Sequence, residues 1–196
     1  MLKTTTGLCS VALLLAAAPQ SRAAIVLSGD FVNGTTTPTL TITEDIVFNI
    51  TSTSSVESVI FDEWTTSDGG QDVAYRDPLG QSLAYLINNS PAMVLIGNLY
   101  DNLAANYGDF TPNDGYLALN GLSVTAGDTL VIKAGSFVFS SSLGFNSLLD
   151  GTTFTGVVFL ADGNGDRISG NGVAVPEPSS VLLCGLGTLA LLRRRR

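Results

Sequence analysis

Oxygen-bearing side chains at alternate positions of the sequence DGNGD mark a candidate calcium loop. Asp162, Asn164 and Asp166 match the start of the calcium-loop pattern, whose carboxylate and amide oxygens are the ligands that Ca²⁺ prefers. The pattern then fails, because Arg167 stands where the loop needs a glycine and Val173 stands where the bidentate acid belongs. A loose calcium site and a polar linker are therefore both open, and calcium is the one cofactor that the sequence suggests.

A second set combines carboxylates with aromatic rings between positions 62 and 116. Rings stack on pyranose faces and acids accept hydrogen bonds from hydroxyls, so the combination predicts carbohydrate binding. Trp64, Tyr75 and Tyr107 are the candidate sugar contacts, whereas a glycoside hydrolase would need Glu63 and a second acid. Alternatively, Trp64 belongs to the core and the acids lie on solvated loops. The set comprises Asp62, Glu63, Trp64, Asp68, Asp72, Tyr75, Asp77, Tyr100, Asp101, Tyr107, Asp109, Asp114 and Tyr116.

Threonine occupies every odd position from 35 to 43, and odd positions of a strand share one face. Several ice-binding proteins present flat threonine rows, but they need two-dimensional arrays, and Pro38 interrupts this single row. The ordinary interpretation is an edge strand with the threonines outside and Leu40 and Ile42 inside.

The composition excludes whole classes of chemistry. The chain has no histidine, so Ser-His-Asp and Cys-His nucleophiles and histidine-ligated zinc are excluded. Lys133 could serve a Ser-Lys arrangement, but we predict that the protein is not an enzyme. Residues 24–175 hold 16 Asp and Glu against three cations, a net charge of −13. Such a domain repels nucleic acid, which is therefore not an expected partner.

Short apolar runs separated by Gly, Ser, Thr, Asn and Asp predict strands in the middle of the chain. Roughly ten short strands predict one all-β domain, a jelly-roll-like β-sandwich over residues 24–160. Only residues 98–107 could form a helix, and residues 161–175, rich in Gly, Asn and Asp, are predicted to be a linker. The predicted strands are 25–31, 39–43, 46–50, 56–61, 82–87, 93–96, 116–119, 129–133, 137–140 and 153–160.

The N-terminus has the features of a secretory signal. Lys3 precedes an apolar run at 8–18 that is too short to span a bilayer, and a proline and small residues follow. We predict that residues 1–23 form a signal peptide and that signal peptidase cuts between Ala23 and Ala24. The chain is then exported across the inner membrane.

The C-terminus combines a Pro-Glu-Pro motif, an apolar run at 181–192 and four arginines. As a helix, this run is about 18 Å long, well short of the ~30 Å hydrocarbon core. The arginines should stay on the cytoplasmic side of the membrane. A short C-terminal apolar helix that anchors the chain briefly and a permanent tail anchor are both open.

This combination resembles the PEP-CTERM sorting signal of Gram-negative bacteria, a tail that is sometimes labelled an ice-binding protein C-terminal domain. The resemblance implies recognition by an exosortase in the inner membrane, cleavage near the Pro-Glu-Pro and transfer to the cell surface or extracellular matrix. The resemblance is specific for sorting and silent about activity. We predict an exported non-enzymatic protein of the cell surface or matrix, with exopolysaccharide as an expected partner; a carbohydrate-binding module is the alternative. The motif residues in the tail (176–196) are Pro176, Glu177, Pro178, Arg193, Arg194, Arg195 and Arg196.

Overall fold

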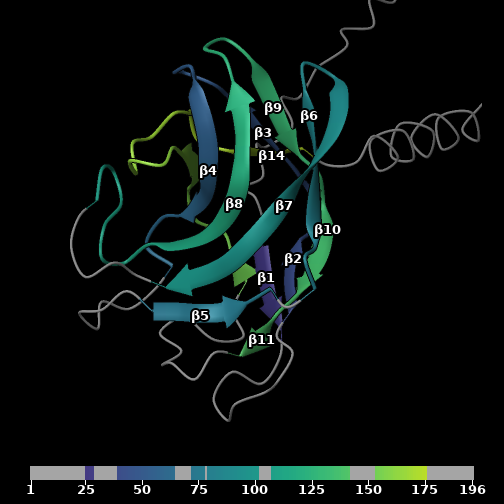
Figure 1. The fold of residues 1–196 in the computed structure, drawn as a ribbon, viewed down its shortest axis with the longest axis vertical. Coiled ribbons are helices and arrows are strands. Elements are labelled where there is room, and N and C mark those ends of the chain that lie inside the picture. The colour runs from purple at the N-terminus through teal and green to yellow at the C-terminus, as the bar shows by residue number, and fades with distance from the viewer. Residues whose placement is uncertain are drawn as a thin grey trace, which may run out of the picture.

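The computed structural model describes residues 25–28, 39–64, 72–77, 79–101, 107–141 and 153–175 (Figure 1). These residues form strands and turns and contain no helix, which confirms the all-β prediction. Within the same ranges, no helix is long and apolar enough to cross a membrane. The predicted signal peptide and C-terminal helix lie outside the described residues.

Fourteen strands make up the described part of the chain. They are β1 (Ile25–Ser28), β2 (Thr39–Ile42), β3 (Asp45–Asn49), β4 (Ser54–Phe61), β5 (Asp72–Arg76), β6 (Ser82–Ile87), β7 (Ser90–Asp101), β8 (Gly115–Val124), β9 (Thr129–Ile132), β10 (Gly135–Val138), β11 (Ser140–Ser141), β12 (Thr153–Phe154), β13 (Val158–Ala161) and β14 (Val173–Val175).

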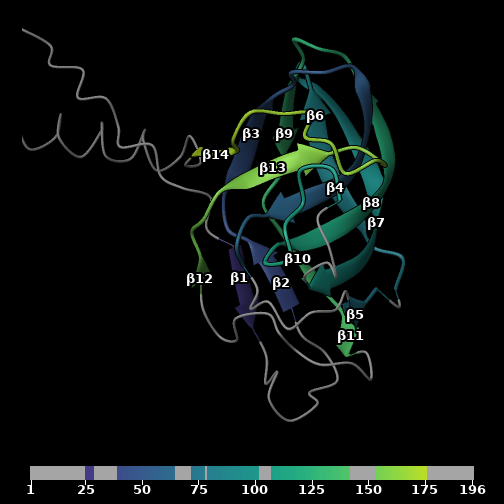
Figure 2. The same ribbon diagram turned by 90° about the vertical axis from the view of Figure 1, so that its left-hand side faces the viewer.

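The strands form two curled antiparallel sheets. The smaller sheet has the order β10-β2-β1-β12, and the larger has the order β13-β4-β8-β7-β6-β9-β3-β14, with β5 and β11 attached beside β7. The twelve residues of β7 join the two halves of the larger sheet, because its first half pairs with β6 and its second half with β8. Figure 1 shows β4, β8 and β7 side by side, and Figure 2 shows β13 beside β4. Strands β6, β9, β3 and β14 continue the larger sheet beyond β7.

The core follows from strand alternation. In β3, Ile46 and Phe48 are buried while the neighbouring Val47 is only half-buried. Alternate residues of a strand point to opposite faces, so each strand contributes one side to the core and one to the surface. The largest fully buried side chains are Trp64, Phe48, Phe61 and Phe139.

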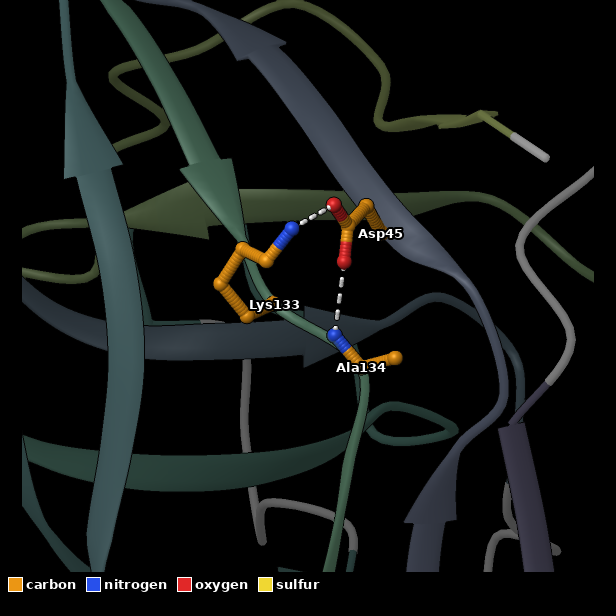
Figure 3. Close-up of polar contacts among 3 residues, drawn as sticks. All are labelled: Asp45, Lys133 and Ala134. Atoms are coloured by element: carbon orange, nitrogen blue, oxygen red, sulfur yellow. Dashed lines mark hydrogen bonds and ion pairs between the residues drawn. The ribbon is translucent and has the colours of Figure 1, made fainter. Parts of the chain in front are cut away.

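The chain passes from the smaller sheet to the larger one at two neighbouring connections. Two residues connect β2 to β3, and two residues connect β9 to β10. The connections lie close together, because β2 pairs with β10 and β3 pairs with β9. There the Asp45 carboxylate accepts a hydrogen bond of 2.9 Å from the Ala134 N–H and forms an ion pair with the Lys133 ammonium (Figure 3). Asp45 thus satisfies a backbone donor where the ladder is broken. The ion pair also holds the ammonium group of Lys133, the residue that a Ser-Lys arrangement would need.

The predicted linker at 161–175 is wrong, because this segment is part of the fold. β14 pairs with β3, and Ile168 and Ala174 are only 2% and 3% exposed. Glycine, asparagine and aspartate favour tight turns as well as linkers, and here they connect strands. The helix considered at 98–107 is also wrong in its first part, since β7 continues to Asp101 and residues 102–106 lie outside the description.

The threonine row is explained in part by β2. Leu40 and Ile42 are buried, as predicted, and Thr41 Oγ1 lies 2.9 Å from Ser136 Oγ on the neighbouring β10. The edge-strand prediction is wrong, because β2 pairs with β1 on one side and β10 on the other. The threonines before Thr39 lie outside the described residues.

Candidate functional site

A row of large side chains lies on the side of the larger sheet that faces away from the main core, in one half of that sheet. Phe159, Ile60, Tyr116 and Tyr100 lie opposite one another on β13, β4, β8 and β7. Their sequence neighbours, such as Leu117 beside Tyr116, are buried in the main core. Alternation therefore directs the row outward, on the opposite side of the sheet from that core.

The loop after β7 extends this row. Tyr116 lies between Tyr100, at a ring-centroid distance of 4.7 Å and an interplanar angle of 11°, and Phe110, at 5.5 Å and 39°. Phe110 is buried in a small cluster with Ile60 and Phe159. Tyr107 contacts Phe110 at 6.3 Å and is 51% exposed. The name aromatic face is used below for Tyr100, Tyr107, Phe110, Tyr116 and Phe159.

Two turns hold the exposed end of the aromatic face. The backbones of Tyr107 and Phe110 bond to each other, and Gly108 between them has a φ of 57°. The turn at 162–167 packs against this one: the Tyr107 hydroxyl donates to the Gly163 carbonyl at 2.9 Å. A Cβ on Gly108 would overlap the Gly165 carbonyl group. Glycine is therefore required here for close approach as well as for its positive φ.

The candidate calcium residues form the second of these turns. Asp162 Oδ1 accepts hydrogen bonds from the backbone N–H groups of Asn164 and Asp166, at 2.9 and 3.1 Å, so Asp162 closes its own turn. Asn164 and Asp166 are exposed. Among the residues that the structure describes, no group of three His, Cys, Asp or Glu could hold a metal ion. Calcium stays a prediction, tested by a calcium-dependent rise in melting temperature that is absent in Asp166→Ala.

Arg167 contributes a cation to the aromatic face. Its guanidinium lies 4.6 Å from the centroid of the Phe159 ring, and its Nε donates to the Ser169 carbonyl at 2.8 Å. Its backbone N–H donates to Asp109 Oδ2 at 2.8 Å, which links the two turns. In the sequence, Arg167 is only a mismatch to a calcium pattern, because no local spacing relates it to Phe159. A backbone bridge between Ala161 and Arg167 brings the two together.

A pair of carboxyl groups lies beside the aromatic face. Asp114 is 1% exposed, and its two oxygens accept the backbone N–H groups of Glu63 at 2.9 Å and Thr111 at 2.8 Å. Partial burial raises the pKa of Asp62, and so do the charge of Asp114 and a hydrogen bond to it. Asp62 therefore keeps its proton to a higher pH than an ordinary aspartate. Glu63 is exposed and has a φ of 55°.

The three predicted sugar contacts are found in different places. Trp64 is 1% exposed, with its ring centroid 4.9 Å from Phe61 and 5.3 Å from Phe154. It therefore lies in the core, which is the alternative that the sequence left open. Tyr75 lies on β5, in register with Leu99 of β7, and its side chain is outside the description. Tyr107 has an exposed ring on the aromatic face.

Sequence reasoning missed Phe110 and Phe159 as part of this face. Every residue of β13 is buried, so alternation gives no sign that Phe159 faces away from the main core. Phe110 is separated from β8 by a turn, and only the loop conformation places it on Tyr116. The registry of Tyr100 with Tyr116 could have been found by pairing the two runs as antiparallel neighbours.

The described residues form an all-β protein with a row of aromatic rings on the side of the larger sheet away from the main core, and only the Tyr107 ring is exposed. Residues 174–196 match the family model of the PEP-CTERM protein-sorting motif, which confirms the resemblance. The motif implies export and processing by an exosortase. No curated protein and no solved structure matches this chain. The motif residues from Pro176 to Arg196 and the predicted signal cleavage site lie outside the described residues.

Proposed function

We propose that this chain is a non-enzymatic protein of the cell surface or extracellular matrix, and that it binds exopolysaccharide through the aromatic face. The PEP-CTERM motif supports the route of export. The observation that carries the binding proposal is the exposed Tyr107 ring at the end of a continuous line of aromatic side chains. The alternative that the sequence left open, a carbohydrate-binding module, is thus included as the activity of the β-domain.

The chemistry of the face suits a neutral or weakly charged sugar chain. Aromatic rings stack on the apolar faces of pyranose rings, while carboxylates accept hydrogen bonds from hydroxyls. Asp109 is exposed beside Phe110, and Arg167, which contacts the Phe159 ring, is a donor in the same neighbourhood. The hydrogen bond from Tyr107 to Gly163 fixes the orientation of the ring before a ligand arrives, which lowers the entropy lost on binding.

The hydrolytic alternative rests on Glu63 and a second acid, and Asp62 and Asp114 are the carboxyl groups that lie beside Glu63. We propose that these groups accept hydrogen bonds from sugar hydroxyls rather than cleave a glycosidic bond. Loss of a measured hydrolytic activity in Glu63→Gln would instead support an enzyme.

The remaining parts of the proposal concern architecture and route. The curled sheets support a jelly-roll-like sandwich, which stays a prediction. We propose that the tail anchors the chain in the inner membrane transiently and is then cut near Pro178. Intact masses from native cell fractions test this: a species from about Ala24 to Pro178 outside the inner membrane is expected. A membrane-bound species that keeps Arg193–Arg196 would instead mean a permanent anchor.

The binding proposal is tested with Tyr107→Ala and purified exopolysaccharide from the strain that carries the gene. We expect roughly two- to tenfold weaker retention in affinity electrophoresis, because a stacked aromatic contact is worth about 0.5–1.5 kcal/mol. Tyr107→Phe should retain most of the binding, since it keeps the ring. Met93→Ala, at an exposed site on β7, is the matched control. Unchanged retention by a folded Tyr107→Ala protein would overturn the proposal.

A further inference from the structure

A second outward row lies on the other half of the larger sheet, and it is entirely aliphatic. Pro91, Leu86, Val131, Val47 and Val173 lie opposite one another on β7, β6, β9, β3 and β14. The strand neighbours of Leu86, Val131, Val47 and Val173 pack in the main core, so these side chains face outward, and Pro91 is exposed at the end of the row. Four strand spacings of about 4.8 Å give the row a length of roughly 19 Å.

The exposed aliphatic side chains of β7 adjoin this row. Met93 is 67% exposed and Leu95 is 47% exposed, both on the outward side of the β6–β7 pair. The name aliphatic face is used below for Val47, Leu86, Met93, Leu95, Val131 and Val173. Met93 and Leu95 are exposed, whereas Val47, Leu86, Val131 and Val173 are half-buried beside them. Aliphatic side chains that gather on neighbouring strands and stay accessible to solvent are typical of an interaction surface.

The chain outside the described residues leaves from the edge of this face. Val175 is the last residue of β14, is 43% exposed and shares its outward side with Val173. The next five residues can span at most about 17 Å. The apolar run at 181–192 follows, and as a helix it is about 18 Å long. This length matches the roughly 19 Å of the aliphatic row.

We propose that residues 181–192 dock on the aliphatic face of their own domain whenever the tail is not in the membrane. The short connection gives the tail a high effective concentration near the aliphatic face, so even a weak contact can hold it there. The four terminal arginines are attracted to a domain with a net charge of −13. Docking hides the apolar segment from water in any full-length chain whose tail has not entered a bilayer, and insertion in the inner membrane replaces the sheet by lipid.

The native thiol of the tail supplies a test in the full chain. Cys184 becomes the only cysteine once Cys9→Ser is introduced. Cys184 lies three residues, about 5 Å, into the apolar run, so it should lie over β3 or β9. A second cysteine is introduced by Val131→Cys, by Met93→Cys at the far strand, or by Asn164→Cys, an exposed control beside the aromatic face.

Disulfide formation is measured in detergent-free buffer with a mild oxidant, on non-reducing gels. We expect Val131→Cys to close an intramolecular disulfide at least ten times faster than Asn164→Cys, with Met93→Cys between them. Phosphatidylcholine vesicles should slow the Val131→Cys reaction, because the bilayer competes for the tail. Met93→Cys keeps the test valid if Val131→Cys does not fold.

Three results would overturn the inference. Equal rates at all positions would mean that the tail samples the surface without a preferred site. Disulfide-linked dimers at high dilution would assign the face to a second copy of the chain. A fast reaction that persists unchanged in Leu86→Asp would show that the aliphatic face does not hold the tail. None of these results depends on whether exopolysaccharide binds.

Discussion

The two outer faces of the larger sheet are built on one strand, β7, and yet they have different chemistry. Its second half carries Tyr100 into the aromatic face, whereas its first half carries Met93 and Leu95 into the aliphatic face. The aromatic face is flanked by Asp62, Asp109 and Arg167, which can exchange hydrogen bonds with a polar ligand. The aliphatic face is suited to excluding water from another apolar surface.

The two faces also differ in how they are held in place. The aliphatic face depends on strand register alone, since every member belongs to a paired strand. The aromatic face depends in addition on two turns that meet at Gly108 and Gly165. A substitution in the turns should therefore impair the aromatic face and leave the aliphatic face intact, whereas a substitution in the shared core should impair both.

The largest effect is expected for Trp64→Ala, which tests the shared core. Removing a buried ring that packs on Phe61 and Phe154 should lower the free energy of unfolding by about 3–5 kcal/mol. Both polysaccharide retention and tail cross-linking should fall together. Urea unfolding followed by tryptophan-independent circular dichroism gives the stability. A stable fold with only polysaccharide binding lost would place Trp64 in the binding site and break the comparison.

Gly165→Ala should impair the aromatic face without affecting the aliphatic face. Gly165 has a φ of 79°, and an added Cβ would lie 2.6 Å from Tyr107 Cδ1 and overlap the Tyr107 carbonyl. We expect a loss of roughly 2–3 kcal/mol in stability and weaker polysaccharide retention, with the rate of Cys184 cross-linking unchanged.

The matched control for this substitution is Gly127→Ala. Gly127 also has a positive φ, of 93°, but nothing lies within 4 Å of an added Cβ. It should cost only the backbone strain, about 1–2 kcal/mol, and should leave both faces functional. Equal losses in the two variants would mean that the contact between the turns contributes nothing.

Asp45→Ala tests the end of the aliphatic face, since Asp45 lies opposite Val175 of β14. It removes the acceptor of the Ala134 N–H and the partner of Lys133, and we expect a loss of about 1 kcal/mol. Asp45→Asn keeps an acceptor and should lose less. Thermal unfolding at low and high salt distinguishes the two contributions, because only the ion pair is screened by salt.

Asp62→Asn should have the smallest effect and should depend on pH. The pKa of Asp62 is raised above its ordinary 3.8, mainly by burial, so ionisation costs more in the folded than in the unfolded chain. Below pH 3.8 the acid is protonated in both states and the variant should match the native chain. As the pH rises through the folded pKa, the native chain pays this cost and the variant does not.

We therefore expect Asp62→Asn to melt slightly higher at pH 7, by about 1 °C or less after solvent screening, and to match the native protein near pH 3. Melting curves across this pH range provide the measurement. A variant that is less stable at pH 7 would mean that the Asp62 carboxylate is needed in its ionised form.

Much of the domain could be predicted from local pattern. The sequence predicts strand 82–87 with the bounds of β6 and places Leu40 and Ile42 inside, because alternation of side chains is a local property of a strand. For the segment 161–175 the sequence predicts a linker wrongly, because the same residues favour turns and linkers. Whether such a segment is packed depends on distant partners, here β3 and the core around Ile168.

The sequence by itself determined the all-β class and the PEP-CTERM address, because alternation and a linear motif are both read within a short stretch of chain. Only the tertiary structure decided which side chains share a surface. The structure places Trp64 in the core and brings Phe159 and Arg167 into the aromatic face with Tyr107. It also aligns five aliphatic residues from five strands in one row. Those groupings depend on register between distant strands, and a shift of one residue would have reversed every face.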